Sequence, residues 1–218
     1  MSGSDPAAVW PVVWLTLRVA GTALLLAALA GVPLGAWLAL ARFRGRRLLV
    51  ALVYTGMGLP PVVVGLVVYL MLSRSGPLGW LGWLFTPEAM ALAQALIALP
   101  LVAGITLSAV AAVPAELYQQ VRALGASCRQ ARRAILREAR AGVLVALAAG
   151  LGRVLAEVGA ALMVGGNIEG HTRTLTTAIV LETGKGQFAI ALALAGWLLG
   201  LALAVNAAIL ALQGRAAP

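Results

Sequence analysis

The sequence has one cysteine, one histidine and few charged residues, and each scarcity excludes a class of protein. Because Cys128 is the only cysteine among 218 residues, no intrachain disulfide can form. His171 is the only histidine, and a lone imidazole in a loop is more typical of a surface or capping group than of a metal ligand, so we expect no metal site. Charged residues make up 11% of the chain against 62% hydrophobic ones, which leaves too little polar surface to cover a soluble globule. The chain is therefore expected to lie in a membrane.

Motifs for catalysis and for nucleotide hydrolysis are also missing. The sequence has no Gly-x4-Gly-Lys-Ser/Thr phosphate loop, and the Gly-Lys-Gly of residues 184–186 lacks its flanking residues. It has no Gly-x-Ser-x-Gly elbow, no His-Glu-x-x-His pair and no group of aspartates that would hold magnesium. An intramembrane enzyme is therefore disfavoured, no cofactor is expected in this chain, and any ATP-driven process needs a separate ATPase chain.

Five apolar runs are long enough to cross the hydrocarbon core, which takes about 20 helical residues. They cover residues 12–41, 48–72, 88–113, 141–164 and 188–212. Because a helix satisfies its backbone hydrogen bonds internally, the fold is expected to be all-α. No stretch between these runs is long enough for a separate soluble domain, which predicts one transmembrane domain over residues 1–218. The N-terminus carries Asp5 and no basic residue, so we expect the first run to remain as a helix and not to be removed as a signal peptide.

The formal net charge of +9 is spread over short connections and forms no continuous basic face, so it predicts orientation in the membrane and no nucleic-acid partner. Four arginines fall within residues 42–47 and six within residues 122–140, whereas the connections 73–87 and 165–187 carry little net charge. The first and third connections are therefore predicted to face the cytoplasm, and the second and fourth to face outward. This arrangement places the N-terminus outside and the C-terminus, with Arg215, inside.

Two pairs of small residues lie within the predicted spans, Gly31 with Gly35 and Gly196 with Gly200. Glycines four residues apart allow two helices to approach closely. For both pairs we expect packing within the chain in preference to a dedicated dimer seam.

The connection of residues 114–140 is long for a link between two membrane helices, which suggests that it has a structure of its own. Apolar residues at spacings of three and four predict a helical stripe, made of Leu117, Val121, Leu124, Cys128, Ala131 and Ile135. Gly125 interrupts the stripe, and Ser127 with Gln130 has the pattern of a capping box. The sequence therefore predicts two short helices joined at a glycine corner, which another protein could bind. Taken alone, the segment also fits a simple helix C-cap at Gly125 with arginines that only set orientation.

The same segment resembles the cytoplasmic EAA loop of ABC importer permeases, which reads Glu-Ala-Ala, three residues, Gly, nine residues and then Ile-x-Leu-Pro. Gln119-Gln120-Val121 stands at the Glu-Ala-Ala position, Gly125 follows at the same offset, and Ile135 comes ten residues later. Arg137 and Glu138 replace the Leu and Pro of the family. The resemblance implies that the loop couples this chain to an ATPase. The residues concerned are Val121, Leu124, Gly125, Ala126, Ser127, Arg129 and Ile135.

Residues 152–168 read GRVLAEVGAALMVGGNI and residues 170–183 read GHTRTLTTAIVLET. Both segments resemble molybdate and tungstate permeases, and the second is most similar to the tungstate branch. Within them, Arg153 and Glu157 are ionised groups inside a span, where charge is costly. Their spacing of four predicts one helical face and an ion pair. The sequence fits two roles for this pair: it could lock the packing of helices, or it could line or gate an anion path.

The outward connection of residues 165–187 is rich in hydroxyl and amide groups, which together with a positive charge could bind a tetrahedral oxyanion. Candidates for the translocation path or its gate are Arg153, Glu157, Asn167 and Thr174. Apolar and polar residues at helical spacing predict a short helix at the outer face, around Leu175, Ala178, Ile179 and Glu182. The resemblance implies that an external binding protein docks on this face. The candidates for docking are Glu169, Arg173, Thr177, Glu182 and Lys185.

The resemblance covers essentially the whole chain and implies a type I ABC importer permease with five transmembrane helices and a cytoplasmic coupling helix. Its implied function is to move an oxyanion from an external binding protein into the cytoplasm. Tungstate is the favoured cargo, and molybdate or another oxyanion is the alternative. The implied partners are a second copy of the chain, two ATPase subunits that hold ATP-Mg, a periplasmic or extracellular binding protein, and membrane lipid. The implied location is the bacterial or archaeal cytoplasmic (inner) membrane, crossed several times. A secondary transporter driven by an ion gradient, with Arg153 and Glu157 as coupling groups, remains the alternative of a different class.

Overall fold

The computed structural model describes residues 6–214, and its regular structure in that range is helical, with no β-strand. In chain order the elements are α1 (Pro6–Leu40), α2 (Arg46–Met57), α3 (Pro61–Leu72), the short 3-10 helix η1 (Gly79–Leu81), α4 (Pro87–Ala111), α5 (Ala115–Ala123), α6 (Cys128–Glu138), α7 (Arg140–Leu155), α8 (Gly159–Gly165), α9 (Leu175–Gly184) and α10 (Phe188–Gly214). The predicted all-α fold is therefore confirmed for this range. Arg215, which we predicted on the inner side, lies outside the described residues.

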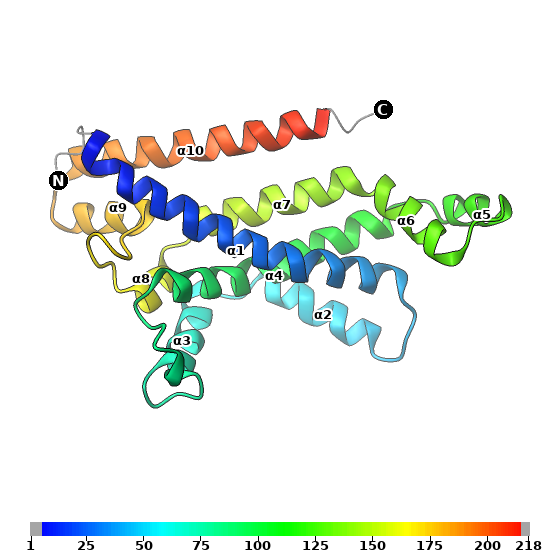
Figure 1. Cartoon of the computed structure of the whole chain (residues 1–218), viewed down its shortest axis with the longest axis horizontal. Coiled ribbons are helices and arrows are strands. Elements are labelled where there is room, and N and C mark those ends of the chain that lie inside the picture. Colours follow the sequence, from blue (N-terminus) through cyan, green and yellow to red (C-terminus); the bar gives the residue numbers. More distant parts are fainter. Residues whose placement is uncertain (1–5, 215–218) are drawn as a thin grey trace.

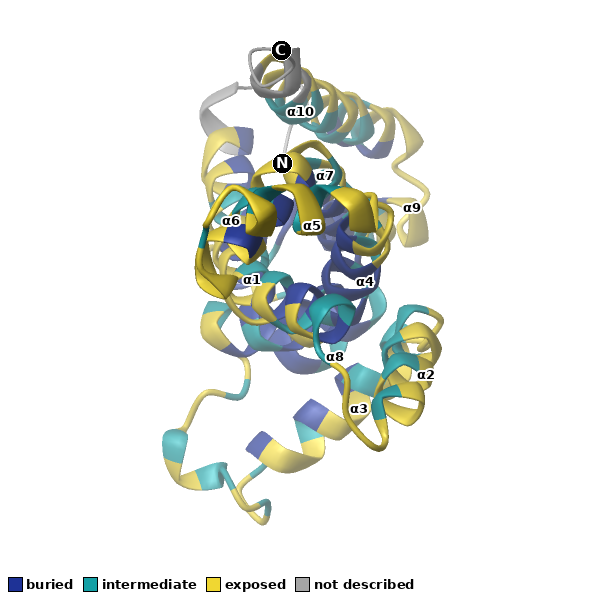
Figure 2. Cartoon of the chain, turned by 90° about the vertical axis from the view of Figure 1, so that its right-hand side faces the viewer, coloured by how far each residue is buried: buried dark blue, intermediate teal, exposed yellow. Residues whose placement is uncertain are grey.

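The two long helices α1 and α4 form the centre of the molecule. Buried residues follow one another along almost the whole of α4, which is the darkest helix at the centre of Figure 2. A Cβ atom on Gly31 would lie 3.0 Å from the carbonyl oxygen of Leu99, and one on Gly35 would overlap the carbonyl of Ala103. Only glycine permits this approach, so the expectation that Gly31 and Gly35 pack within the chain is confirmed.

Two of the five predicted spans are bent pairs of helices. Residues 48–72 form α2 and α3, which are bent by 101°, and residues 141–164 form α7 and α8, which are bent by 59°. The first bend falls before Pro60 and Pro61, because proline lacks the N–H that would continue α2 and clashes with the preceding turn. Among the described residues, three helices (α1, α4 and α10) are long and apolar enough to cross a membrane, and five candidate spans result if each bent pair counts as one. The prediction of five spans therefore holds only on that count.

The second halves of the two bent spans, α3 and α8, pack tightly against each other. A Cβ atom on Gly65 of α3 would lie 2.7 Å from the Cα atom of Ala160, and one on Gly159 of α8 would lie 2.9 Å from a methyl group of Val62. Each helix thus presents a glycine where the other comes closest. This contact fixes the directions of α3 and α8 after the two bends.

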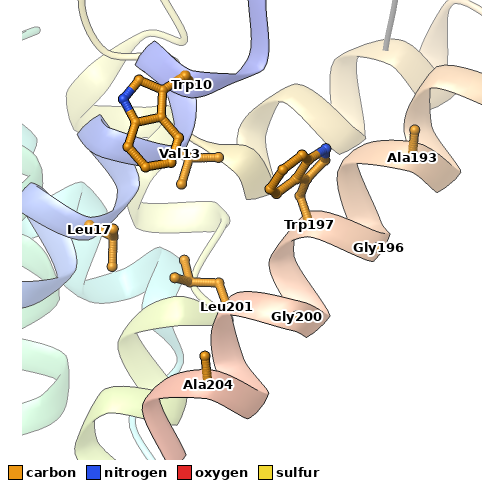
Figure 3. A pocket seen from close by; sticks show the side chains of 9 residues that line it. All are labelled: Trp10, Val13, Leu17, Ala193, Gly196, Trp197, Gly200, Leu201 and Ala204. Carbon is orange, nitrogen blue, oxygen red and sulfur yellow. The ribbon is translucent and has the colours of Figure 1, made fainter. Parts of the chain in front are cut away.

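Helix α10 packs loosely against the rest of the chain, contrary to our expectation for Gly196 and Gly200. No atom lies within 4 Å of the Cβ position of either glycine. Both line an apolar groove of about 560 Å³ between α1 and α10. Figure 3 shows Trp10 of α1 and Trp197 of α10 on opposite walls of this groove. The predicted close packing of this glycine pair within the chain is therefore wrong.

Connections predicted to share one side of the membrane lie at the same end of the molecule. The turn between α1 and α2 and the helices α5 and α6 lie together, whereas the start of α1 and helix α9 lie at the opposite end (Figure 1). We call the first of these the arginine-rich end, because it carries the four arginines of residues 42–47 and the six of residues 122–140. Which side of the membrane this end faces stays a prediction.

Candidate functional site

Helices α5 and α6 meet at a tight corner whose first half is a helix C-terminus closed by glycine. Gly125 adopts a φ of +86°, and its N–H donates to the carbonyl of Arg122 at 3.0 Å. The N–H of Ala126 donates to the carbonyl of Val121 at 3.3 Å. These two bonds are those of a Schellman motif, in which a left-handed residue lets the last free carbonyls of a helix be satisfied. The predicted glycine corner between two short helices is therefore confirmed.

The second half of the corner is a helix N-terminus closed by reciprocal side-chain bonds. The N–H of Gln130 donates to the hydroxyl of Ser127 at 3.3 Å, and the N–H of Ser127 donates to the side-chain oxygen of Gln130 at 2.7 Å. The predicted capping box is therefore confirmed. In addition, the Arg122 guanidinium donates to the carbonyl of Ala126 at 2.6 Å. Hydrogen bonds on both sides thus hold residues 125–127 in one conformation.

The corner is exposed at its tip and anchored at its base. Leu124 is 88% exposed, although it is a large apolar residue. At the base, Ile135 and Ala139 pack with Ala36 of α1 and Val110 of α4. The predicted apolar stripe therefore divides: Ala131 and Ile135 are buried, Leu117 and Val121 are half-buried, and Leu124 and Cys128 are exposed, as is Arg129. Exposed leucine at the tip of a rigid element is typical of a surface that another protein covers.

Helix α6 is joined directly to α7. Ala139 is at once the C-cap of α6 and the N-cap of α7. A displacement of the corner is therefore passed to α7, because no flexible linker separates the two helices.

Arg153 and Glu157 do not form the predicted ion pair on one helical face. Helix α7 ends at Leu155, so the helix breaks between the two residues. The three ion pairs among residues 6–214 are Arg18 with Glu88, Arg173 with Glu169, and Lys185 with Glu182. Arg153 is half-buried and has no hydrogen-bonding or ionic partner in the described part of the chain.

Glu157 is buried inside the break and serves as a cap. Its carboxylate accepts a hydrogen bond from the N–H of Ala160 at 2.8 Å, in the first turn of α8. Its backbone carbonyl accepts a bond from the hydroxyl of Thr176 at 3.0 Å. Because the capping bond satisfies a free N–H of α8, the helix can start again in a new direction at this point. Glu157 therefore joins the break to the segment that starts α9.

The four hydroxyl groups of residues 172–177 are buried and engaged within the chain. Thr172 donates to the carbonyl of Gly165 at 2.5 Å and accepts from the N–H of Ile168 at 2.9 Å. Thr174 and Thr177 form a capping box at the start of α9. The short helix predicted here is confirmed, but these hydroxyls are not the free oxyanion donors that we expected, because each hydroxyl has only one proton to donate. Thr174 and Thr177 are both at most 2% exposed.

The charged candidates of the outward face separate into exposed and buried residues. Glu169 is exposed and pairs with Arg173 at 3.2 Å, beside a hollow of about 650 Å³ that Arg18, Glu88 and His171 also line. The Nε atom of Arg173 and the Oδ1 atom of Asn167 are buried without a partner. Glu182 is buried and accepts a bond from the exposed Lys185 at 2.9 Å. Asn167 has a φ of +51°, which a non-glycine residue seldom adopts.

Sequence reasoning missed two features. Arg18 of α1 pairs with Glu88 of α4 at 3.3 Å, and the charge of Arg18 inside an apolar run was a signal for a partner. Gln94 and Thr106 are buried in α4, and each has a side-chain oxygen without a partner. Polar residues within the third apolar run were the available signal. No three His, Cys, Asp or Glu side chains gather into a possible metal site in the range that the structure covers.

Comparisons with known proteins agree on one family. The family described as "Binding-protein-dependent transport system inner membrane component" matches residues 31–213. A "Probable anion ABC transporter permease protein" of Haloferax volcanii is 46% identical over 198 residues, covering 88% of this chain and 85% of the relative. The "Tungstate uptake system permease protein TupB" of Peptoclostridium acidaminophilum is 40% identical over 205 residues, covering 94% of this chain and 90% of the relative.

A solved structure has the same fold. It is an inward-facing conformation of the MetNI methionine ABC transporter, and it superposes with a TM-score of 0.79 over 98% of this chain and 100% of that chain, at 20% identity. At that identity the likeness concerns the fold alone.

Proposed function

Because the chain belongs to the family of binding-protein-dependent transport system inner membrane components, we propose that it is the membrane permease of an ATP-driven tungstate importer. It is an ABC transporter permease, located in the inner membrane, and its sequence has no phosphate loop. The ATP, with its Mg²⁺, is therefore held and hydrolysed by a separate partner chain. Tungstate is chosen as the cargo because a tungstate permease is 40% identical over almost the whole chain.

The observation that carries the proposal is the α5–α6 corner. It is exposed at Leu124, fixed by hydrogen bonds at residues 125–127, and anchored by Ile135 on α1 and α4. In the proposed cycle the ATPase binds the tip through Val121, Leu124, Gly125, Ala126, Ser127 and Arg129. Movement of the ATPase then turns α6, and α7 follows because Ala139 belongs to the ends of both helices.

The proposed anion path passes the break between α7 and α8. Arg153 has no partner within the described residues, and an unpaired guanidinium inside a span attracts an anion. Asn167 is half-buried in the segment after α8, and its amide group is the part that could donate to an anion, although Nδ2 lies 3.5 Å from the carbonyl of Thr177. Glu157 and Thr174 shape this region as caps, since both already bond within the chain. Their role in the path is thus to position the backbone.

On the outer face, we assign docking of the binding protein to the exposed part of the candidate set. Glu169 and Lys185 are exposed and Arg173 is half-buried, whereas Thr177 and Glu182 are buried. The buried pair supports the surface, because Glu182 fixes the ammonium group of Lys185. Alternating exposed charges suit a transient polar interface.

The proposed assembly is a homodimer with two ATPase subunits and an external binding protein. Five candidate spans are few for enclosing a path, and the open groove between α1 and α10, with Gly196 and Gly200 on its wall, offers apolar surface for a second copy or for lipid. The single domain of residues 1–218 supplies one half of the path in this assembly.

Uptake of metal oxyanions by cells tests the proposal. We expect a strain without this gene to accumulate little tungsten from medium containing nanomolar tungstate, and the wild-type gene to restore it, as measured by mass spectrometry of cell digests. Equal loss of molybdenum at the same concentrations would identify molybdate as a cargo. Uptake by the purified chain alone in vesicles without ATP would overturn the proposal in favour of a secondary transporter.

A further inference from the structure

The turn between α1 and α2 is not used by the proposed transport cycle, yet it is fixed and strongly charged. Arg46 donates from Nε to the carbonyl of Leu38 at 2.7 Å, which ties the turn to the last turn of α1. Arg42, Arg44 and Arg47 are exposed, and within the described residues none of the three has a hydrogen bond or an ion pair. Three unpaired guanidinium groups are thus held on one short, anchored segment.

An aromatic pair stands beside these arginines. Trp37 of α1 stacks on Phe43 of the turn, with ring centroids 4.7 Å apart and planes 21° apart. The stack is open to its surroundings, since Trp37 is 49% exposed and Phe43 is 36% exposed. Aromatic rings of this kind are typical of the level where hydrocarbon meets headgroups.

Two hollows lie next to the stack, and each is lined by one of its rings. The first measures about 310 Å³ and is lined by Phe43, Gly45 and three arginines, Arg42, Arg46 and Arg47. The second measures about 360 Å³ and is mostly apolar, with Trp37 and Leu136 on its walls and one cation, Arg132. A basic hollow and an apolar hollow side by side match the two parts of an amphiphile.

The depth of the turn separates it from the surface proposed for the ATPase. The candidate span in α1 ends at Leu40, so residues 42–47 begin two residues beyond the end of that span. Helices α5 and α6 project further out than this turn (Figure 1). Ten arginines but only two acidic residues, Glu116 and Glu138, belong to the arginine-rich end, so this end is strongly positive.

We propose that this turn is a binding site for the headgroup of an anionic phospholipid in the leaflet that the arginine-rich end faces. Arg42, Arg44 and Arg47 bind the phosphate, because the guanidinium fork matches phosphate oxygens in two-point hydrogen bonds. The Trp37 and Phe43 rings hold the glycerol region, and the apolar hollow takes the start of an acyl chain. The site does not depend on the identity of the transported anion.

Lipid titration of the intact transporter tests this site. The detergent-purified complex of this chain with its ATPase is titrated with dioleoyl phosphatidylglycerol, with dioleoyl phosphatidylcholine, or with inorganic phosphate, and bound molecules are counted by native mass spectrometry. We expect saturable binding of phosphatidylglycerol, and weak binding of phosphatidylcholine. Millimolar phosphate should fail to displace the lipid, since it lacks the apolar part that fills the second hollow.

The decisive variant is R42Q/R47Q, with R133Q/R137Q as its control. Both variants remove two exposed arginines from the same end of the molecule, and neither touches the tip residues proposed to bind the ATPase. We expect the first to bind phosphatidylglycerol about 10- to 100-fold more weakly, from about 1 kcal/mol per basic residue near a headgroup, and the control to bind within about twofold of wild type. A second variant, F43A, keeps every charge and should also weaken lipid binding.

Three outcomes would overturn the proposal. Equal losses in the two double variants would mean that only net charge matters. Displacement of the lipid by inorganic phosphate would mean a free-anion site. A loss of copurifying ATPase from R42Q/R47Q with unchanged lipid binding would assign the turn to the ATPase interface.

Discussion

The carboxylate of Glu157 accepts a hydrogen bond from the N–H of Ala160 at 2.8 Å, although Glu157 is only 4% exposed. This bond caps α8 at the place where the fourth span changes direction. Replacing Glu157 with Ala removes the acceptor, whereas Gln keeps an oxygen and removes only the charge. We expect E157A to lower the free energy of unfolding by about 1–2 kcal/mol and E157Q to lower it less. Thermal unfolding of the purified transporter in detergent measures both, and equal losses would contradict the capping role.

Arg153 and Glu157 should act independently, because the helix break keeps them from pairing. We expect the effects of R153A and E157A on the free energy of unfolding to add within about 0.5 kcal/mol in the double variant. The same unfolding assay completes this double-mutant cycle. A coupling energy clearly above that limit would restore the ion pair predicted from their spacing.

Gly125 should tolerate no β-branched residue, because its φ is +86°. No atom lies within 4 Å of its Cβ position, so the strain comes from the backbone alone, at about 1–2 kcal/mol. We expect G125V to insert normally but to lose tungsten uptake and copurifying ATPase, and G125N, which tolerates this φ, to keep part of both. Gly21 of α1 has equally open space and lies within a helix, so G21V is the matched control. Wild-type uptake by G125V would show that the corner needs no left-handed residue.

Ser127 and Gln130 should stabilise the corner as a unit, because each caps the backbone of the other. We expect S127A to cost about 1 kcal/mol locally and S127A/Q130A to cost little more, since the first change already opens the box. Hydrogen exchange of the amides of residues 127–130 measures the local opening. Fully additive losses of protection would mean that the two bonds are separate.

Gly65 should be the most size-sensitive residue of the contact between α3 and α8. Its Cβ atom would lie 2.7 Å from Cα of Ala160 and 3.3 Å from the sulfur of Met163. We expect G65A to destabilise the protein by about 1–3 kcal/mol, because the opposing backbone cannot yield. G21A, which meets open space in α1, should be neutral or slightly stabilising. Equal melting temperatures for the two variants would contradict tight packing between the bent spans.

Features set by neighbours in the sequence could be predicted. The capping box of Ser127 and Gln130 and the corner at Gly125 depend on bonds over three to five residues, so the local pattern contains all the partners. The apolar runs likewise identify helices, because hydrocarbon requires them.

Features set by distant partners could not be predicted. The spacing of Arg153 and Glu157 indicates one helical face, but the helix breaks where Gly159 packs on Val62 of another span. The hydroxyl of Thr176 bonds to the carbonyl of Glu157, nineteen residues earlier. Neither contact can be read from composition or periodicity. The sequence therefore could not show that the hydroxyls expected to bind an anion are already bonded to the backbone.

Because α6 and α7 share Ala139 and α7 continues unbroken to Leu155, no flexible linker lies between the corner and the break. Along this path the two helices meet at Ala139, and the next interruption is at residues 156–158. In the proposed cycle, a rotation passed along α7 therefore changes the angle between α7 and α8 at this break, and the capping bond on α8 sets the stiffness of that change.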